Sequence, residues 1–365
     1  MTAAALRRVT IDHPDTDGPR LRTMMSTASL ALQGMVRLAL SIAVGRLAGP
    51  DALAQVTAGL AAASVLSLLW PSATGAAASR FIAAGQERHD PRALRQVTGH
   101  LGRRTLQASA LLAPVGTLYW LLTQGDLAEA LTIGALTIGL GGYAFIRGVH
   151  TGSRQIRRLI VWDFAASVCG VLGTVAVVAS GVHSVLALLP LACGYLLITL
   201  AGWPPTAPER PQDAADMDHF VAWSTLGTVT SAGLIHMAML VAHGRLSPAD
   251  AGAFAAALNL VSPAALLANS FSMVLFPSVA SAFARGDTEG ALRQTRRATD
   301  GLVFVMVSIF GSISLLAPWI VEMLWGEPFV LAAVIFPVLA IGPFARAISM
   351  PAVTSLSSRE RRGVQ

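Results

Sequence analysis

Ten long apolar stretches constrain the fold of this chain more than any other feature of its sequence. A helix needs about 20 apolar residues to cross the hydrocarbon core of a bilayer. On that measure the predicted spans are Ser26–Gly45, Ala52–Ala78, Leu106–Leu122, Ala130–Ile146, Leu159–Ala179, Ser184–Trp203, Phe220–Ala242, Gly252–Ala280, Leu302–Trp319 and Phe329–Met350. Only Arg37, Asp163 and Arg346 are charged within these spans, although the chain carries 26 basic and 20 acidic residues. The sequence therefore predicts an all-α integral membrane protein of about ten transmembrane helices.

The basic residues are all arginines, and they are distributed unevenly between the two sides of the predicted membrane. The two tails and every second loop hold 22 of the 26, whereas the remaining loops hold only Arg46 and Arg245. Because positively charged loops stay in the cytoplasm, both termini are predicted to be cytoplasmic. The arginines separate apolar runs instead of clustering on a polar fold, which excludes a nucleic-acid-binding protein. The N-terminus has no signal-peptide pattern, so the first span is expected to be retained.

An internal repeat with an offset near 199 residues connects the two halves of the chain. Gly45-Arg46-Leu47 recurs as Gly244-Arg245-Leu246, each followed by a proline and an aspartate. Two further pairs occur in the same order, namely Ala78-Ser79-Arg80-Phe81 with Ala280-Ser281-Ala282-Phe283, and Phe145-Ile146-Arg147 with Phe344-Ala345-Arg346. Because each pair occupies an equivalent place relative to the predicted helices, we interpret the chain as two repeated lobes.

The repeat predicts a domain organisation. Residues 1–25 are a cytoplasmic tail, 26–203 an N-lobe of six helices, 204–219 a proline-rich cytoplasmic linker, 220–350 a C-lobe of four helices, and 351–365 a second cytoplasmic tail. Six helices return the chain to the same membrane side, so the lobes are predicted to be parallel repeats. Gln365 corresponds to Ala166 of the first lobe. The C-lobe is therefore expected to be incomplete, with impaired transport by this chain alone.

These features resemble the multidrug/oligosaccharidyl-lipid/polysaccharide exporter superfamily. The resemblance rests on the two lobes, on the Gly-Arg-Leu turn after helices one and seven, and on Phe276-Pro277 before a basic loop, and it covers residues 21–365. Within the superfamily the chain is most similar to the polysaccharide-biosynthesis flippases. The resemblance implies a V-shaped exporter that moves a lipid-diphosphate-linked oligosaccharide or polysaccharide precursor across the bacterial inner membrane by alternating access. It implies the lipid-linked glycan and polysaccharide-assembly proteins as partners.

Arg37 is the principal candidate for substrate binding. A guanidinium in the middle of a span costs about 2.5 to 3.5 kcal/mol on insertion scales, so a partner must offset the cost. Ser29, Gln33, Arg37 and Ser41 follow one another at steps of four residues and form one polar stripe on the first helix. We interpret the stripe as a cavity wall that holds an anion such as a diphosphate. The alternative is a structural arginine that caps carbonyl groups of a neighbouring helix.

Further cavity candidates lie on the later helices. His236 is the repeat equivalent of Arg37, and its role is either packing or proton coupling, since histidine titrates near neutrality. Asn259 and Asn269 are candidates for binding sugar hydroxyls, with hydrogen bonding between helices as the alternative. Arg346 is also placed among the cavity candidates, although its long side chain could instead reach the cytoplasmic interface. For Asp163 we expect an ion pair with Arg147 or Arg158.

Two arginine-rich loops are candidates for contact with anionic membrane lipids. Residues 90–104 are predicted to form an interfacial helix capped by Asp90, with Leu94, Val97 and Leu101 on one side. The membrane-surface candidates in the two loops are Arg92, Arg95, Arg103, Arg104, Arg293, Arg296 and Arg297. The alternative is that these arginines only fix the topology.

The sequence contains no phosphate-binding loop, metal-ligand cluster or nucleophile elbow, so neither a cofactor, a metal nor an enzymatic activity is predicted. The principal hypothesis is a flippase for an anionic lipid-linked glycan. The alternatives are a multidrug or cation antiporter of the same fold and a non-transporting membrane scaffold. A cation antiporter requires carboxylates within the spans, and Asp163 alone meets that requirement.

Overall fold

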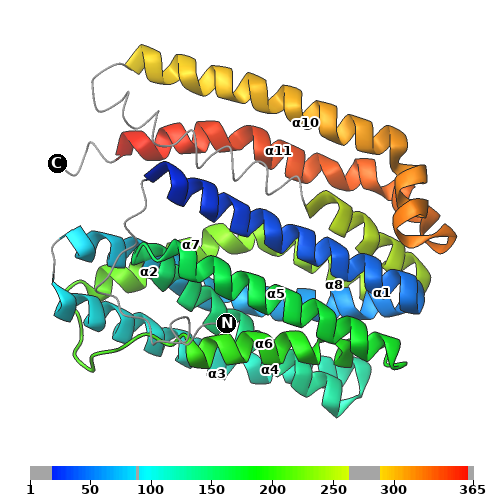
Figure 1. Cartoon of the computed structure of the whole chain (residues 1–365), viewed down its shortest axis with the longest axis horizontal. Coiled ribbons are helices and arrows are strands. Elements are labelled where there is room, and N and C mark those ends of the chain that lie inside the picture. Colours follow the sequence, from blue (N-terminus) through cyan, green and yellow to red (C-terminus); the bar gives the residue numbers. More distant parts are fainter. Residues whose placement is uncertain (1–18, 88–89, 263–287, 361–365) are drawn as a thin grey trace. The chain divides into compact units, whose positions relative to one another are not determined.

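The computed structural model describes residues 19–87, 90–262 and 288–360, and the regular elements in these ranges are helices (Figure 1). Seven of the helices are long and apolar enough to cross a membrane. The other predicted spans fall in the bent helix α1, in the shorter apolar stretch Val185–Ala201, and partly beyond residue 262, outside the described residues. The predicted all-α membrane fold is confirmed.

The first two predicted spans lie in one bent helix and the helix that follows it. Helix α1 runs from Pro19 to Leu69 and bends at Gly49, whose φ of 80° is not helical, immediately before Pro50. Helix α2 (Pro71–Glu87) begins with the second proline of this region. Because proline lacks the N–H needed inside a helix, both prolines lie where one helical segment ends and another begins.

Helix α3 (Pro91–Gln124) is capped by Asp90, whose carboxylate accepts hydrogen bonds from the N–H groups of Arg92 at 2.9 Å and Ala93 at 3.2 Å. The predicted cap is confirmed, but the helix does not lie separately on the membrane surface, since it continues without a break through the third span. Its residues Leu94 and Leu101 are buried in a hydrophobic core with α2 and α4. The predicted interfacial helix is thus the first part of α3, and its apolar side packs against other helices.

The remaining helices follow the predicted spans in order. They are α4 (Leu127–Gly152), α5 (Ile156–Ala179), the short η2 (Val185–Leu188), α6 (Leu189–Ala201), α7 (Ala214–Thr228), the π turn η3 (Val229–Gly233), α8 (Leu234–Arg245), a helix over 248–262, α10 (Thr288–Trp325), the short η4 (Glu327–Phe329) and α11 (Val330–Glu360). Helices α7, η3 and α8 follow one another directly, so together they form the predicted seventh span.

The chain divides into two structural units whose boundaries differ from those of the predicted lobes. The first unit contains residues 51–251, and the second contains 19–50 and the chain from 252 onward. The first segment of α1 therefore packs with α10 and α11, whereas α7 and α8 pack with α2 and α3. The first helix of the predicted N-lobe thus lies in the second unit, with the later helices of the C-lobe. The first helix of the predicted C-lobe lies in the first unit, with the later helices of the N-lobe.

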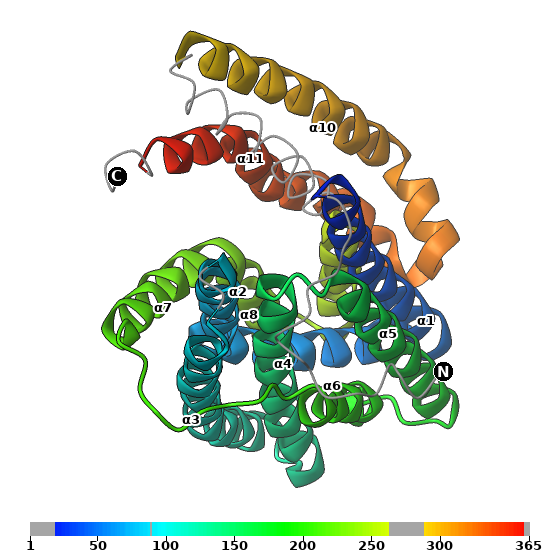
Figure 2. The same cartoon turned by 60° about the vertical axis from the view of Figure 1, so that its left-hand side comes forward.

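The position of α7 follows from its contacts in the first unit. Met217 and Val221 of α7 are buried in the core formed by α2, α3 and α4. The ring of Phe220 meets that of Phe81 edge-on at 6.1 Å, and the Arg80 guanidinium lies 4.8 Å from the Phe220 centroid. Figure 2 shows α7 beside α2. These aromatic and cation–π contacts add to the burial of apolar surface and attach α7 to this unit.

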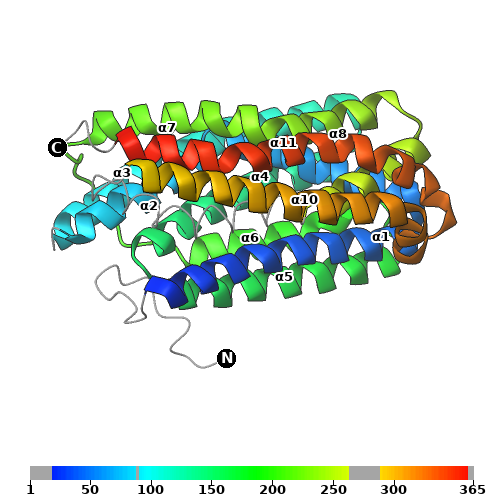
Figure 3. The same cartoon turned by 90° about the horizontal axis from the view of Figure 1, so that it is seen from above.

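The second unit packs α10 against α11, and the two helices lie side by side in Figure 3. The first segment of α1 joins them through Gly45, where an added Cβ would lie 2.5 Å from the Trp325 ring. Glycine thus permits close approach between α1 and the end of α10.

The ends of α3 and α10 share one feature that supports the repeat. Helix α3 ends before Gly125 (φ 81°), and α10 ends before Gly326 (φ 98°). The Gly125 N–H donates to the carbonyl of Leu121 at 3.0 Å, and the Gly326 N–H donates to that of Glu322 at 2.9 Å. Positive φ is readily available to glycine. The two helices therefore end in similar ways at equivalent places.

Candidate functional site

Arg37 is exposed on the first segment of α1, in the second unit. Pro50 follows it by 13 residues, and a helix rises 1.5 Å per residue, so Arg37 lies about 20 Å along the axis from the bend. With a hydrocarbon core of about 30 Å, this distance corresponds to the interior of the membrane. Among the described residues, the structure records no ion pair or hydrogen bond for Arg37. An exposed guanidinium at this depth requires a polar environment or an anion.

Ser41 and Asn259 form a hydrogen-bonded cluster in the same unit. Asn259 Nδ2 donates to Ser41 Oγ at 3.1 Å, and Trp325 Nε1 donates to the Ser41 carbonyl oxygen at the same distance. Ser41 and Trp325 are buried. These contacts agree with the alternative role predicted for Asn259, which is hydrogen bonding between helices. They connect α1, the 248–262 helix and α10.

His236 is half-buried in α8, three residues after the π turn η3. Such turns occur frequently at functional sites. His236 belongs to the first unit and Arg37 to the second, and the predicted roles of His236 in packing or proton coupling stay predictions. Asn269 and the side chains of Gln33 and Arg346 lie outside the described residues.

The membrane-surface candidates differ in their contacts. Arg103 donates to the Pro208 carbonyl at 3.1 Å, and Arg104 pairs with Asp218 of α7 with an N–O distance of 2.6 Å. These two arginines thus connect α3 with the linker and with α7. The exposed members of the set are Arg92, Arg95, Arg103, Arg293, Arg296 and Arg297.

The predicted linker packs along the first half of α3. Thr98 Oγ1 donates to the Pro205 carbonyl at 2.9 Å, and the Ala207 N–H donates to the Arg95 carbonyl at the same distance. Asp218, which lies near the end of the predicted linker and already in α7, accepts from Arg104 and lies 3.0 Å from His100 Nε2. Sequence patterns did not identify this cluster, because its members are more than 100 residues apart.

Asp163 is buried in the first unit and lies 3.7 Å from Arg147 NH1. The Tyr143 hydroxyl also donates to its carboxylate. The predicted ion pair with Arg147 is confirmed, and it compensates the charge of this carboxylate. Metal ligands do not gather in groups of three or more anywhere in the described ranges.

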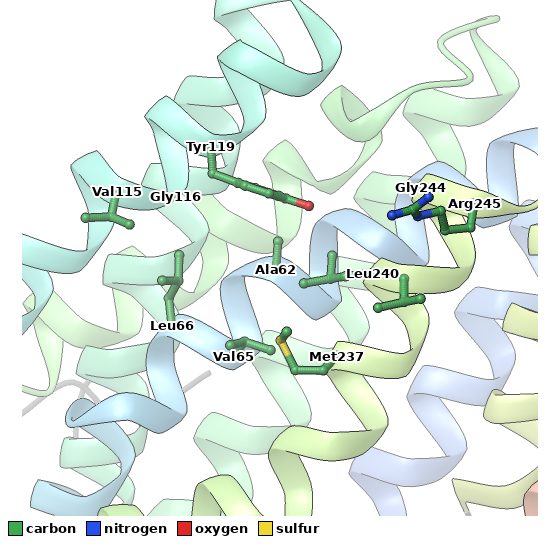
Figure 4. A pocket seen from close by; sticks show the side chains of 11 residues that line it. Ala62, Val65, Leu66, Val115, Gly116, Tyr119, Met237, Leu240, Gly244 and Arg245 are labelled. Atoms are coloured by element: carbon green, nitrogen blue, oxygen red, sulfur yellow. The ribbon is translucent and has the colours of Figure 1, made fainter.

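A cavity of about 480 Å³ lies wholly within the first unit, between α1, α3 and α8 (Figure 4). Its apolar lining comes from Ala62, Val65, Leu66, Val115, Gly116, Met237, Leu240 and Val241, and Gly244 lies next to Arg245 at one end. Tyr119 points its hydroxyl toward the side where the Arg245 guanidinium lies, as Figure 4 shows. In the sequence, Arg245 stands out only in the distribution of arginines and in the repeated Gly-Arg-Leu turn. Its place in a cavity could not be predicted, because three distant segments form that cavity.

The fold is similar to that of solved transporters. An inward-facing multidrug resistance MATE family transporter of the MOP superfamily is 16% identical, with a TM-score of 0.64, and the match covers 89% of this chain and 82% of that one. An outward-facing multidrug resistance MATE family transporter is 14% identical, with a TM-score of 0.58 and coverage of 94% and 84%.

A MOP superfamily transporter from Pyrococcus furiosus, described as having a binding pocket of reversed polarity, is 14% identical. Its TM-score is 0.52, and the match covers 95% of this chain and 85% of that one. At these identities the similarity establishes the fold alone. No curated protein sequence matches the chain.

Residues 101–334 match a protein family described as "Polysaccharide biosynthesis protein". The match covers more than half of the chain, from the middle of α3 into α11, and so includes parts of both units. The multi-pass helical membrane fold agrees with that of the MOP superfamily structures. The chain is therefore a member of the polysaccharide biosynthesis protein family with a MOP-type transporter fold.

Proposed function

We propose that the protein moves a lipid-diphosphate-linked oligosaccharide or polysaccharide precursor across the bacterial inner membrane by alternating access, with both termini in the cytoplasm. The family and the transporter fold support a role in transport for polysaccharide synthesis. The choice of substrate rests on the guanidinium of Arg37, which is exposed although it lies within the first predicted span.

Arg37 would bind the diphosphate of the substrate. A guanidinium forms two parallel hydrogen bonds with phosphate oxygens, and these charge-assisted bonds are stronger than neutral ones. Such pairing would offset the cost of placing Arg37 in the membrane. A lysine at this position would keep the charge but lose the paired geometry.

The alternative of a cation antiporter requires a carboxylate that is free to exchange ions. Asp163 is the acidic residue within the predicted spans, and its contacts with Arg147 and Tyr143 compensate its charge. This arrangement favours an anionic substrate over a cation.

The test compares wild type with Arg37→Lys and Arg37→Ala in nanodiscs and proteoliposomes. The probe is a short-chain prenyl-diphosphate-linked sugar with a fluorescent label on the sugar. We expect binding to weaken in the order wild type, Lys, Ala, with at least a tenfold loss for Ala, since hydrogen bonds to charged groups contribute about 1.5 to 3 kcal/mol. Movement of the probe across proteoliposome membranes should fall in the same order.

Arg92→Ala is the matched control, because it removes an equally exposed arginine outside the predicted spans. Its binding should equal that of wild type. Normal binding and movement of the probe by a correctly inserted Arg37→Ala variant would refute the diphosphate mechanism. Accumulation of a lipophilic cation driven by a proton gradient, without movement of the probe, would favour the antiporter.

A further inference from the structure

The cavity between α1, α3 and α8 combines an open apolar interior with two polar groups at one end. Val115, Tyr119, Met237 and Val241 are between 45% and 59% exposed, so the cavity opens at the surface of the first unit. Its volume of about 480 Å³ lies within the range of small-molecule sites, which is about 300 to 1,000 Å³. Helix α8 belongs to the predicted seventh span, so the acyl chains of surrounding lipids can reach this opening.

Arg245 of this cavity differs in its contacts from Arg46, its counterpart in the repeat. Arg46 is engaged at the end of α10, where it donates to the carbonyl of Leu324 at 3.0 Å and also to that of Met323. Arg245 occupies the equivalent place in the second Gly-Arg-Leu turn. In the ranges that the structure describes, no hydrogen bond or ion pair is recorded for Arg245, and its side chain lines the cavity.

The contacts at the end of α3 differ from those at the end of α10. Thr123 Oγ1 already donates to the carbonyl of Tyr119 at 2.9 Å and lies 3.3 Å from that of Trp120. Trp120 in turn stacks on His243 of α8, with the ring planes 8° apart. In α10 the residue two positions before the glycine is Leu324, which has no hydroxyl group. Arg46 thus caps the carbonyl groups at the end of α10. Arg245 lines the cavity instead, where its guanidinium can bind an anion.

We propose that this cavity binds one acyl chain of an acidic phospholipid from the non-cytoplasmic leaflet, and that Arg245 and Tyr119 bind its phosphate. The guanidinium provides paired donors, and the phenol hydroxyl provides a further donor from α3. Arg245 is in the last turn of α8, where the negative end of the helix dipole favours its charge. An apolar cavity with a cation at its end thus complements an amphipathic anion. This site shares no residue with the substrate proposal, which rests on Arg37.

The test measures the binding of single lipids to the purified chain by native mass spectrometry. Phosphatidylglycerol is the acidic probe, and phosphatidylethanolamine with the same chains is the zwitterionic one. Arg245→Gln should weaken phosphatidylglycerol binding about tenfold, since a charge-assisted bond to the phosphate is lost. It should weaken phosphatidylethanolamine binding less, because the ammonium group of that lipid already offsets the charge of its phosphate. Arg245→Lys should give an intermediate affinity. Arg210→Gln removes an exposed arginine of the predicted linker and should retain the tightly bound lipid.

A second variant tests the apolar part of the site. Met237→Trp places a larger side chain at a lining position and should weaken the binding of both lipids, because the acyl chain is displaced. Leu234→Trp is its control, since Leu234 lies on the same helix, is 68% exposed and does not line the cavity. Thermal unfolding in detergent verifies that each variant is folded.

Three results would overturn the proposal. The first is wild-type affinity for phosphatidylglycerol in both Arg245→Gln and folded Met237→Trp. The second is a loss confined to Arg245→Gln, which would make Arg245 a headgroup contact without an occupied cavity. The third is displacement of phosphatidylglycerol from this site by the prenyl-diphosphate-linked sugar at equal or lower concentration, which would make the cavity part of the transport route.

Discussion

Replacing Gly148 by alanine tests the crossing of α2 and α4, where two backbones meet. A Cβ at Gly148 would lie 2.7 Å from the Cα of Gly75 and 2.6 Å from its carbonyl carbon, whereas carbon atoms in contact keep about 3.5 to 4.0 Å. The helices must therefore separate by about 1 Å. Overpacking costs about 1 to 3 kcal/mol, and the better helix propensity of alanine returns about 0.5 to 1 kcal/mol. We expect the free energy of unfolding to fall by about 1 to 2 kcal/mol.

The assay is a reversible SDS titration in mixed micelles, followed by tryptophan fluorescence. Gly194→Ala is the matched control, because a Cβ at this position in α6 has no neighbour within 4 Å. The control should gain up to about 1 kcal/mol from helix propensity alone. The reasoning is refuted if Gly148→Ala is as stable as wild type or gains as much as Gly194→Ala.

Three further substitutions test individual contacts with the same titration. Asp218→Asn removes the ion pair with Arg104 and alters the hydrogen bond to His100. Since the Arg104 side chain is 41% exposed, we expect the free energy of unfolding to fall by about 1 kcal/mol. An unchanged stability would show that the cluster does not attach α7. Arg46→Gln should cost about 1 kcal/mol through the lost carbonyl contacts at the end of α10, and an equal loss in Arg46→Lys would contradict a requirement for the guanidinium. Trp325→Phe keeps an aromatic ring but loses the indole N–H donor, so a loss of about 1 kcal/mol is expected, and wild-type stability would mean that its hydrogen bond contributes nothing.

The membrane-spanning helices could be predicted from the sequence because charged side chains are costly in hydrocarbon. The predicted boundaries failed where a long helix extends beyond the membrane span. Leu94 and Leu101 have the spacing of an interfacial helix, yet they are buried against α2 and α4, since spacing shows which residues share a face and not what covers it. The assignment of α7 to the first unit could likewise not be predicted from the sequence, because it depends on the contact between Phe81 and Phe220, which are 139 residues apart.

The candidate site was predictable only in part. Arg37 could be identified because an arginine is conspicuous within an apolar span. The contacts of Ser41 with Asn259 and Trp325 could not be derived, since these residues come together from three helices. Arg46 and Arg245 occupy the same Gly-Arg-Leu tripeptide, and only the structure shows that one caps α10 while the other lines a cavity.

The division of the chain at Pro50 and Ala251 has a mechanical consequence. Within the described residues, the polypeptide passes from one unit to the other only at these two places. They are neighbours in the second unit, because a Cβ at Gly252 would lie 2.6 Å from the carbonyl carbon of Pro50. Both covalent connections between the two units therefore lie side by side in the second unit, so a change of shape at this one place would affect both of them.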